Sequence, residues 1–387
     1  MASLDADVAV VGLGAMGSQA LWRLARRGVR AVGIDQFPPG HDRGASHGES
    51  RIIRTAYAEG SAYVPLLRES WRLWAELESV TGERLVRRTG GLMLGPPRSQ
   101  TVHGAIDSAL AYGLTHQVLD AAAVRARFGV HRVDAGTVGC YEPEAGVVHP
   151  ERAVRAAVRA AERSGAEVLV GTAVAEVIPD PARPRLRLGE RTLTVRHVVV
   201  AGGGWTSRLV PRLAGRLRVV RRVMGWFAAE QRADFGPDRC PIFIRAAADH
   251  PESRVWYGLP GLDGGPVKLG LHVWPGIDEP VDPVRGPRPP DQADARALAD
   301  LAAATLTGLR PAPVRLAVCT YTLTPDLHFL VGWRRDLPGL TVLAGFSGHG
   351  FKLAPAIGEA AAELALTGST ALPIRLFDPH RFDAVPG

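Results

Sequence analysis

Three glycines that follow an apolar strand form the first candidate binding site in the chain. Residues 7–35 read DVAVVGLGAMGSQALWRLARRGVRAVGID, and Gly12, Gly14 and Gly17 lie between an expected strand at 8–11 and an expected helix. Gly12 permits a tight turn, Gly14 lets a pyrophosphate approach bare backbone, and Gly17 lets the helix lie close to the strand. The helix N-terminus adds about half a positive charge. The spacing therefore predicts a dinucleotide-binding βαβ unit.

Asp35 closes the second strand of this unit. Its carboxylate can accept hydrogen bonds from ribose hydroxyls and would repel a 2′-phosphate, which disfavours NADP. An ordinary glycine-rich loop is the alternative, but a strand on each side of the helix favours the nucleotide site. This stretch fits FAD as well as NAD.

Two further segments concentrate polar side chains. The run GASHGESRIIRTAY at 44–57 places Ser46, His47, Arg51 and Arg54 within nine positions, and an exposed polar loop explains them equally well. In PVKLGLHVW, the alternation of a strand puts Lys268 and His272 on one face. They would lie about 13 Å apart with a gap at Gly270, so they could flank a ligand but could not hydrogen-bond to each other.

The last two candidate segments lie near the C-terminus. The strand pattern of AVCTYTL aligns Cys319 with Tyr321, and an isolated cysteine in a strand is usually a buried small hydrophobe. A strand at 340–346 then leads into a third glycine-rich turn, SGHGFK, and a helix that ends near residue 366. The N-terminus of that helix suits an anion, such as the N1/C2 carbonyl region of a reduced flavin.

Between these segments the pattern alternates between helices and strands. A helix with Pro65 in its first turn carries Leu67, Trp71, Trp74 and Leu77 on one face, which indicates a core stripe. Further elements are expected as helices at 99–112, 151–164 and 291–306 and as strands at 167–170 and 195–200, the latter ending in a second glycine-rich edge. Residues 216–318 are rich in strands.

Composition narrows the class of protein. The chain has 387 residues, 46% of them hydrophobic, no leader-like N-terminus and no long apolar run, so we expect a globular cytoplasmic protein that does not enter a membrane. Its three cysteines form no pair, which argues against disulfides and against a thiolate metal site. The net charge of +7 comes from scattered arginines, and the run RLRVVRR at 216–222 is expected to be a half-exposed strand on a solvated surface, so nucleic acid is not the expected partner. Only two of the 46 lysines and arginines are lysines, Lys268 and Lys352. In a chain that otherwise uses arginine, a lysine suggests a position that needs a compact ammonium of adjustable pKa.

Taken together, these segments resemble the monomeric sarcosine oxidase and N-methyltryptophan oxidase family of flavoprotein amine oxidases. GLGAMG, HGESRIIRTAY, KLGLH, AVCTYT and GFSGHGFK occur in that order and span nearly the whole chain. The resemblance implies an α/β protein in which a Rossmann-like FAD domain is interleaved with a substrate domain built on a β-sheet. We expect the FAD domain to comprise residues 1–86, 148–215 and 319–387, and the substrate domain to comprise 87–147 and 216–318.

The resemblance also implies roles for individual residues. Cys319 would be the covalent thioether to FAD, and Arg54 and Lys352 would clamp the carboxylate of a small amino-acid substrate. His272, Tyr257, Tyr321 and His47 would lie on the substrate side, while Lys268 and Arg51 would be the basic groups where O2 reacts. The other residues expected to touch the cofactor are Gly12, Gly14, Gly17, Asp35, Ser46, Gly348 and Gly350, with Gly348 also facing the substrate. Structural roles are the alternative for each, above all for Tyr257 and His47.

The implied reaction is the two-electron oxidation of a secondary amine to an imine by FAD in a monomeric enzyme, with O2 converted to hydrogen peroxide. Two features depart from the family pattern. Glu49 and Ser50 replace the more usual aspartate and threonine, and the segment 244–254 is several residues longer than its family counterpart and is expected to form a loop or hairpin over the substrate cavity. A tailoring oxidase for a cyclic amino acid such as pipecolate or proline fits the same residues. An NAD-dependent dehydrogenase and a non-catalytic or nucleic-acid-binding flavoprotein remain as rivals from other classes.

Overall fold

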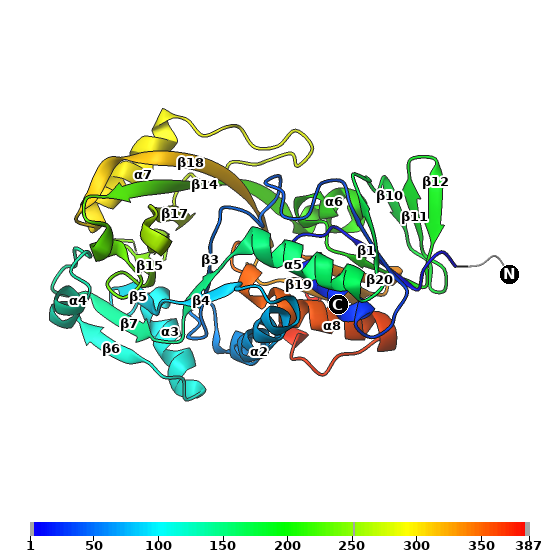
Figure 1. Cartoon of the computed structure of the whole chain (residues 1–387), viewed down its shortest axis with the longest axis horizontal. Coiled ribbons are helices and arrows are strands. Elements are labelled where there is room, and N and C mark those ends of the chain that lie inside the picture. Colours follow the sequence, from blue (N-terminus) through cyan, green and yellow to red (C-terminus); the bar gives the residue numbers. More distant parts are fainter. Residues whose placement is uncertain (1–3, 251, 384–387) are drawn as a thin grey trace.

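The computed structural model describes residues 4–250 and 252–383 and is organised around two large β-sheets that lie side by side (Figure 1). The first has the strand order β19 (Leu330–Arg334), β20 (Leu337–Ala344), β13 (His197–Val200), β1 (Val8–Val11), β2 (Ala31–Asp35) and β9 (Glu167–Val170). Neighbouring strands are parallel except β19 and β20. The three central strands are almost entirely buried, as expected for a parallel sheet covered on both faces.

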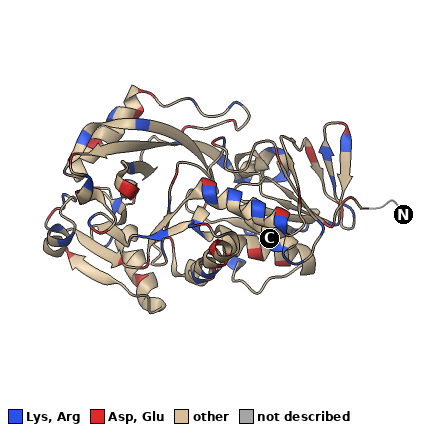
Figure 2. Ribbon diagram, in the orientation of Figure 1, with Lys and Arg blue, Asp and Glu red and all other residues tan. Residues whose placement is uncertain are grey.

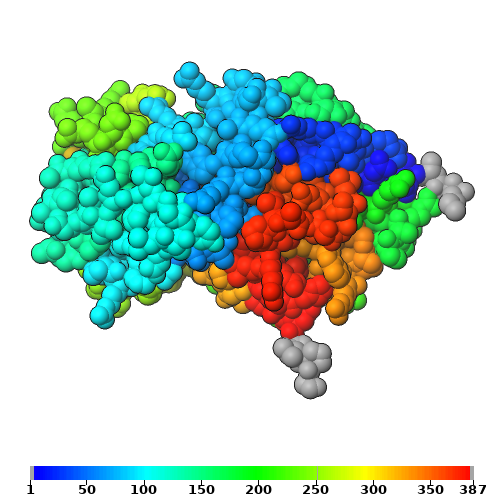
Figure 3. Space-filling model, turned by 90° about the horizontal axis from the view of Figure 1, so that it is seen from below, coloured from blue at the N-terminus to red at the C-terminus, as the bar shows by residue number. Residues whose placement is uncertain are grey.

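Helices cover one face of this sheet, namely α1 (Ala15–Ala25), α2 (Val64–Thr81), α5 (Pro150–Arg163) and α8 (Ala354–Thr367). Seen from below, the C-terminal segment lies directly against the N-terminal one, consistent with the packing of α8 on α1 (Figure 3). The other face packs against a small sheet of β10 (Glu176–Ile178), β11 (Arg185–Leu188) and β12 (Arg191–Thr194). Gly17 is required where α1 meets the glycine turn, because a Cβ there would lie 1.8 Å from the carbonyl oxygen of Gly12.

The second sheet has the strand order β18 (Leu309–Leu323), β14 (Arg218–Ala229), β17 (Val267–Val273), β16 (Val255–Leu259), β15 (Ile242–Ala246), β5 (Gly91–Gly95), β7 (Val138–Glu142) and β6 (Gln117–Asp120). Its helices are α3 (Gln100–Ala111), α4 (Ala121–Arg127) and α7 (Gln292–Thr305). Ser99 caps α3, and Asp291 forms a capping box with Asp294 at the start of α7.

A three-stranded sheet joins the two halves. It consists of β3 (Arg51–Ile53), β8 (Gly146–Val148) and β4 (Val86–Arg88), and β3 carries the first part of the RIIR motif. A short helix, α6 (Thr206–Leu209), follows the glycine-rich end of β13. The predicted α/β fold with a Rossmann-like unit and a second β-sheet is confirmed. The five-segment domain division stays a prediction, and its last boundary, between residues 318 and 319, falls inside β18.

Two local predictions need correction. The run at 216–222 is a strand only from Arg218 on, and Arg221 and Arg222 are buried rather than solvated. Asp294 and Asp278, both distant in sequence, form ion pairs with them. The last glycine-rich turn does not enter its helix directly, since a 3-10 turn at Phe351–Leu353 precedes α8. No helix within residues 4–250 and 252–383 is long and apolar enough to cross a membrane.

Candidate active site

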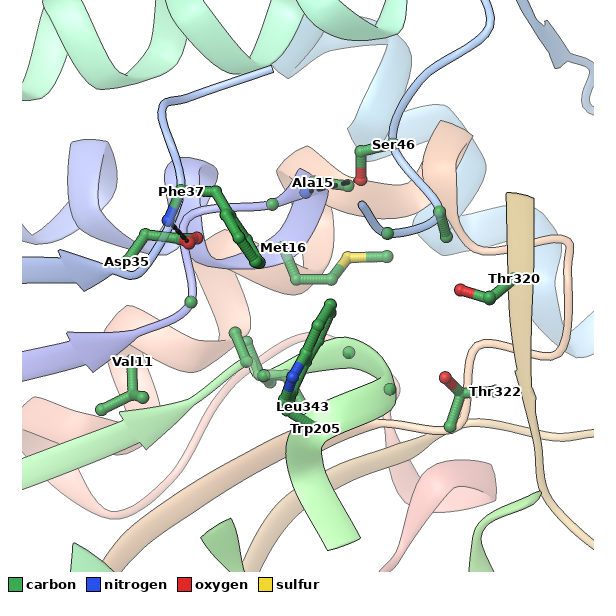
Figure 4. A pocket seen from close by; sticks show the side chains of 18 of the residues that line it. Val11, Ala15, Met16, Asp35, Phe37, Ser46, Trp205, Thr320, Thr322 and Leu343 are labelled. Carbon is green, nitrogen blue, oxygen red and sulfur yellow. Dashed lines mark hydrogen bonds between the residues drawn. The ribbon is translucent and has the colours of Figure 1, made fainter. Parts of the chain in front are cut away.

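A cavity of about 370 Å³ lies at the carboxyl ends of β1, β2 and β13 (Figure 4). Its wall includes the glycine turn after β1, the Gly202–Gly204 edge after β13 and the turn at 345–350 after β20. Ligands of open α/β sheets bind at this edge of the strands. Gly12 and Gly14 line the cavity with backbone, and Gly17 lies behind them against the strand.

One end of the cavity is shaped for a nucleoside. The Asp35 carboxylate accepts hydrogen bonds from the backbone N–H groups of Leu13 at 2.7 Å and Phe37 at 2.9 Å, so it fixes the glycine turn while still lining the cavity. The rings of Phe37 and Trp205 project into the space from opposite walls, with centroids 5.8 Å apart (Figure 4). Sequence reasoning missed these two rings, which lie far apart in the chain.

The middle of the cavity presents polar hydrogen-bonding groups. The Ser46 hydroxyl accepts the N–H of Ala15 at 3.1 Å, at the start of α1. Thr320 and Thr322 direct their hydroxyl groups from β18 toward the cavity (Figure 4). Glycines, a ribose-facing carboxylate and two aromatic rings fit a dinucleotide such as FAD.

Cys319 lies near the cavity but is not among the residues that line it. It alternates with Thr320 along β18 and is buried beside Tyr321 and Met224. Burial raises the pKa of the Cys319 thiol, and the cations of Arg51 and Lys268 oppose this rise. The predicted neighbours of the cysteine are therefore present, although the covalent link itself stays a prediction.

Lys268 is almost completely buried at 2% exposure. Its ammonium donates to the carbonyl oxygens of Gly48, at 2.9 Å, and Ser50, and to the Ser50 hydroxyl at 3.1 Å. Burial, followed by the cation of Arg51, lowers the pKa of Lys268 well below its usual range. Lys268, on β17, thus links the loop at 47–51 to the second sheet by hydrogen bonds.

Arg51 and His47 flank this lysine. Arg51 donates to the carbonyl oxygens of Ser50 at 3.0 Å and Ala45 at 2.7 Å, and it lines the cavity. His47 is buried, and its Nε2 has no hydrogen-bond partner among the described residues. Burial and then Arg51 lower the pKa of His47 to about 4, so the ring is neutral at physiological pH.

Tyr257 fills the gap that the sequence suggested beside Gly270. The two residues are cross-strand neighbours, and a Cβ on Gly270 would lie 2.5 Å from the Tyr257 hydroxyl. The gap expected beside Gly270 is therefore not open, because an aromatic ring from the adjacent strand occupies it; that Lys268 and His272 flank a ligand stays a prediction.

His272 and Tyr321 face each other beside Tyr257. The His272 Nδ1 lies 3.4 Å from the Tyr321 hydroxyl, and burial lowers the pKa of His272 to about 4. Gly348 allows this arrangement, since its φ is +81° and a Cβ there would lie 2.2 Å from the Tyr321 ring. Gly350 follows in the same cavity wall.

Arg54 and Lys352 converge on the ring of Tyr57. The guanidinium carbon of Arg54 lies 4.4 Å from the ring centroid and the Lys352 nitrogen lies 5.1 Å from it. Lys352 donates to the carbonyl oxygen of His349 at 2.7 Å and approaches the Tyr57 hydroxyl at 3.4 Å. Burial, followed by the cation of Arg54, lowers the pKa of Lys352 to about 7.

Glu59 is the charged residue of this cluster that sequence reasoning missed. Its carboxylate accepts a hydrogen bond from Arg54 at 2.5 Å. Burial opposes its ionisation, but Arg54, His349 and Lys352 outweigh this effect and hold the pKa of Glu59 well below its usual range. The one available signal was its position, two residues after the RIIRTAY motif.

The hairpin loop between β15 and β16 contacts other parts of the second sheet. Glu252 accepts the backbone N–H of Gln100 at 2.9 Å, and the Arg254 guanidinium lies 5.4 Å from the Trp274 ring centroid. Of this segment, residues 244–250 and 252–254 do not line the nucleotide cavity, and residue 251 lies outside the described residues. Residues 4–250 and 252–383 contain no cluster of three or more metal-ligating side chains.

Comparison with known proteins agrees with this geometry. Residues 7–364 match the family model of FAD-dependent oxidoreductases. The chain is 38% identical to monomeric sarcosine oxidase of Streptomyces avermitilis over 98% of both chains, and 30% identical to N-methyl-L-tryptophan oxidase of Yersinia pestis over 98% of this chain and 100% of that one. A solved variant of NikD, described as an unusual amino acid oxidase essential for nikkomycin biosynthesis, superposes with a TM-score of 0.84 at 25% identity, covering 97% of this chain and 98% of that chain.

The chain therefore belongs to the FAD-dependent oxidoreductase family that includes monomeric sarcosine oxidase and N-methyl-L-tryptophan oxidase. FAD is its cofactor, and an NAD-dependent dehydrogenase is no longer a competitive alternative.

Proposed function

We propose that this enzyme oxidises the C–N bond of a small secondary amino acid, N-methylated or cyclic, to an imine. The observation that carries the proposal is the pair of buried cations, Arg54 and Lys352, at Tyr57. The Arg54 Nε is buried and has no hydrogen-bond partner in the described part of the chain, and two contacts leave one of the three Lys352 donors free. A buried cation pair with spare donors suits a carboxylate.

Glu59 determines how the substrate carboxylate enters. In the structure it already accepts a hydrogen bond from Arg54 and neutralises part of the positive charge. An incoming carboxylate must either share Arg54 through the free Nε or displace Glu59 from the guanidinium. Glu59 thus offsets the charge of Arg54 and leaves Lys352 as the cation without a carboxylate partner among the described residues, to which a substrate carboxylate can bind.

The residues around this clamp favour an uncharged amine. His272 is neutral near pH 7 because burial lowers its pKa to about 4. Tyr257 and Tyr321 add aromatic surface beside it. A fixed carboxylate in this pocket orients the adjacent C–N bond toward the cavity wall formed by Arg51 and Gly348.

FAD in the cavity would accept the two electrons that leave the CH–NH unit as it becomes C=N and pass them to O2, which with two protons gives hydrogen peroxide. Lys268 supplies a localised positive charge beside Arg51, which suits the developing anion when O2 is reduced. We further propose that Cys319 holds FAD covalently, since it lies next to the same two cations. The monomeric state suggested by the sarcosine oxidase relatives and a cytoplasmic location also belong to this proposal.

A peroxide-release screen over sarcosine, N-methyltryptophan, pipecolate and proline tests the substrate class. We expect peroxide from at least one of them and none from amines that lack the carboxylate. Turnover restricted to pipecolate or proline would favour the tailoring-oxidase alternative, which the structural similarity to NikD supports. Equal turnover of an acid and its decarboxylated amine would contradict the role of Arg54 and Lys352.

A further inference from the structure

A second concave surface lies between α2, β4 and the start of α5, away from the nucleotide cavity. This arginine groove encloses about 970 Å³. Its lining includes five arginines, at positions 72, 84, 87, 88 and 152, against two carboxylates, Glu78 and Asp263. Figure 2 shows blue bands on β4 and along α5, beside α2. The groove therefore carries an excess of positive charge.

The carboxylates in and beside the groove offset only part of this charge: Arg72 pairs with Glu69 and Arg88 with Glu144, both outside the lining. Glu78 accepts the backbone N–H groups of Leu85 and Val86, at 2.6 and 2.9 Å, so its oxygens face the start of β4. Asp263 pairs with Arg87, but its side chain is 86% exposed, so solvent screens the pair.

Arg84 and Arg152 are the available cations. Both are exposed, and neither has an ion-pair or hydrogen-bond partner within the described ranges. Arg88 lies beside them with its guanidinium carbon 5.4 Å from the ring centroid of Trp71. Guanidinium groups bind phosphate and carboxylate oxygens bidentately, so a groove holding several of them favours a ligand with more than one negative charge.

The floor of the groove is hydrogen-bonded to the segments that carry the substrate clamp. The Trp71 Nε1 donates to the Thr55 hydroxyl at 3.0 Å, and Thr55 follows Arg54. The Trp74 Nε1 donates to the carbonyl oxygen of Lys352 at 3.0 Å. A ligand that shifts Trp71 would therefore act on the segment of Arg54, and one that shifts Trp74 would act on Lys352.

We propose that the arginine groove binds a small anion with two or more negative charges, a phosphate ester or a polycarboxylate, and that its occupancy changes the affinity of the clamp for substrate. The concave shape favours a small ligand over a flat protein surface. Coupling of this kind is reciprocal, so substrate would change the affinity for the anion by the same factor.

Binding is tested on the FAD-loaded enzyme by calorimetric titration with tripolyphosphate and, separately, with citrate at constant ionic strength. The double variant Arg84→Ala/Arg152→Ala should bind at least tenfold more weakly than wild type. Arg98→Ala/Arg163→Ala is the matched control, because both arginines are exposed and lie outside the groove, and the change of charge is the same. Equal weakening in both double variants, or no binding of either anion to wild type, overturns the proposal that the groove is an anion site. The anion that binds more tightly identifies the ligand class.

A separate measurement tests the coupling between the arginine groove and the substrate clamp. The substrate dissociation constant, from anaerobic flavin reduction, should change severalfold when saturating tripolyphosphate is added to wild type. Trp71→Phe keeps an aromatic ring but removes the hydrogen bond to Thr55. This variant should still bind the anion, but the anion should change its substrate dissociation constant much less than that of wild type. A wild-type constant that the anion leaves unchanged overturns the coupling, whatever the binding result.

Discussion

Replacing Lys352 should change both the strength and the pH dependence of carboxylate binding. Its ammonium is buried among Tyr57, His349 and Arg54, and burial and Arg54 lower its pKa to about 7. The side chain is therefore protonated below about pH 7 and loses its charge as the pH rises through that value. A ligand carboxylate should bind most tightly at the acid end of this range.

The size of the effect follows from a single charge-assisted hydrogen bond. Such a bond contributes about 1.5 to 3 kcal/mol, which corresponds to about 10- to 100-fold in affinity. Since the bound carboxylate also raises the pKa of Lys352, affinity should fall about tenfold per pH unit above pH 7 and level off about 1 to 2 units higher. Lys352→Met should show the weak, pH-independent affinity throughout.

Methoxyacetate is a suitable ligand because it resembles sarcosine but has no titrating amine. Its dissociation constant can be measured from the change in flavin absorbance between pH 6 and pH 9. Lys352→Arg is the control, since a guanidinium stays protonated over this range and should remove the pH dependence while keeping much of the affinity. A wild-type profile that is flat, or one that survives in Lys352→Met, would refute the assignment.

Three more predictions concern other residues of the site. Cys319→Ala should release its flavin on acid precipitation while wild type keeps a yellow pellet; colour that washes out of wild type, or stays in the variant, would exclude the thioether. Lys268→Met should reduce its flavin within about tenfold of the wild-type rate but react with O2 several orders of magnitude more slowly, and stopped flow giving the opposite pattern would place Lys268 on the substrate side. Glu59→Gln removes the anion that raises the pKa of Lys352, so the pH midpoint for methoxyacetate should move down, and an upward shift would contradict this electrostatic role.

Elements that local patterns define were predictable from the sequence. The glycine turn, the strand at 8–11 and the helix with Pro65 in its first turn follow from spacing, alternation and the position of a proline, all of which act within a few residues. Asp35 was expected at the end of its strand, although its bonds to Leu13 and Phe37 give it a structural role beyond ribose binding.

Features that depend on distant residues were not predictable. Arg221 is buried because Asp294, from the start of α7, forms an ion pair with it, and the charge run alone suggested a solvated strand. Tyr257 fills the space beside Gly270 because β16 and β17 pair in one register, which the alternation in a single strand does not contain. Phe37 and Trp205 meet only because β2 and β13 both end at the cavity.

Anaerobic mixing of the FAD-loaded enzyme with secondary amino acids is the direct test of amine oxidation. We expect the flavin absorbance of wild type to bleach with sarcosine or a larger N-methyl or cyclic amino acid, and to return with one equivalent of peroxide when O2 is admitted. Arg54→Met/Lys352→Met should bleach far more slowly at the same substrate concentration. Flavin that stays oxidised with every secondary amino acid, or bleaches equally fast in the double variant, would contradict the account.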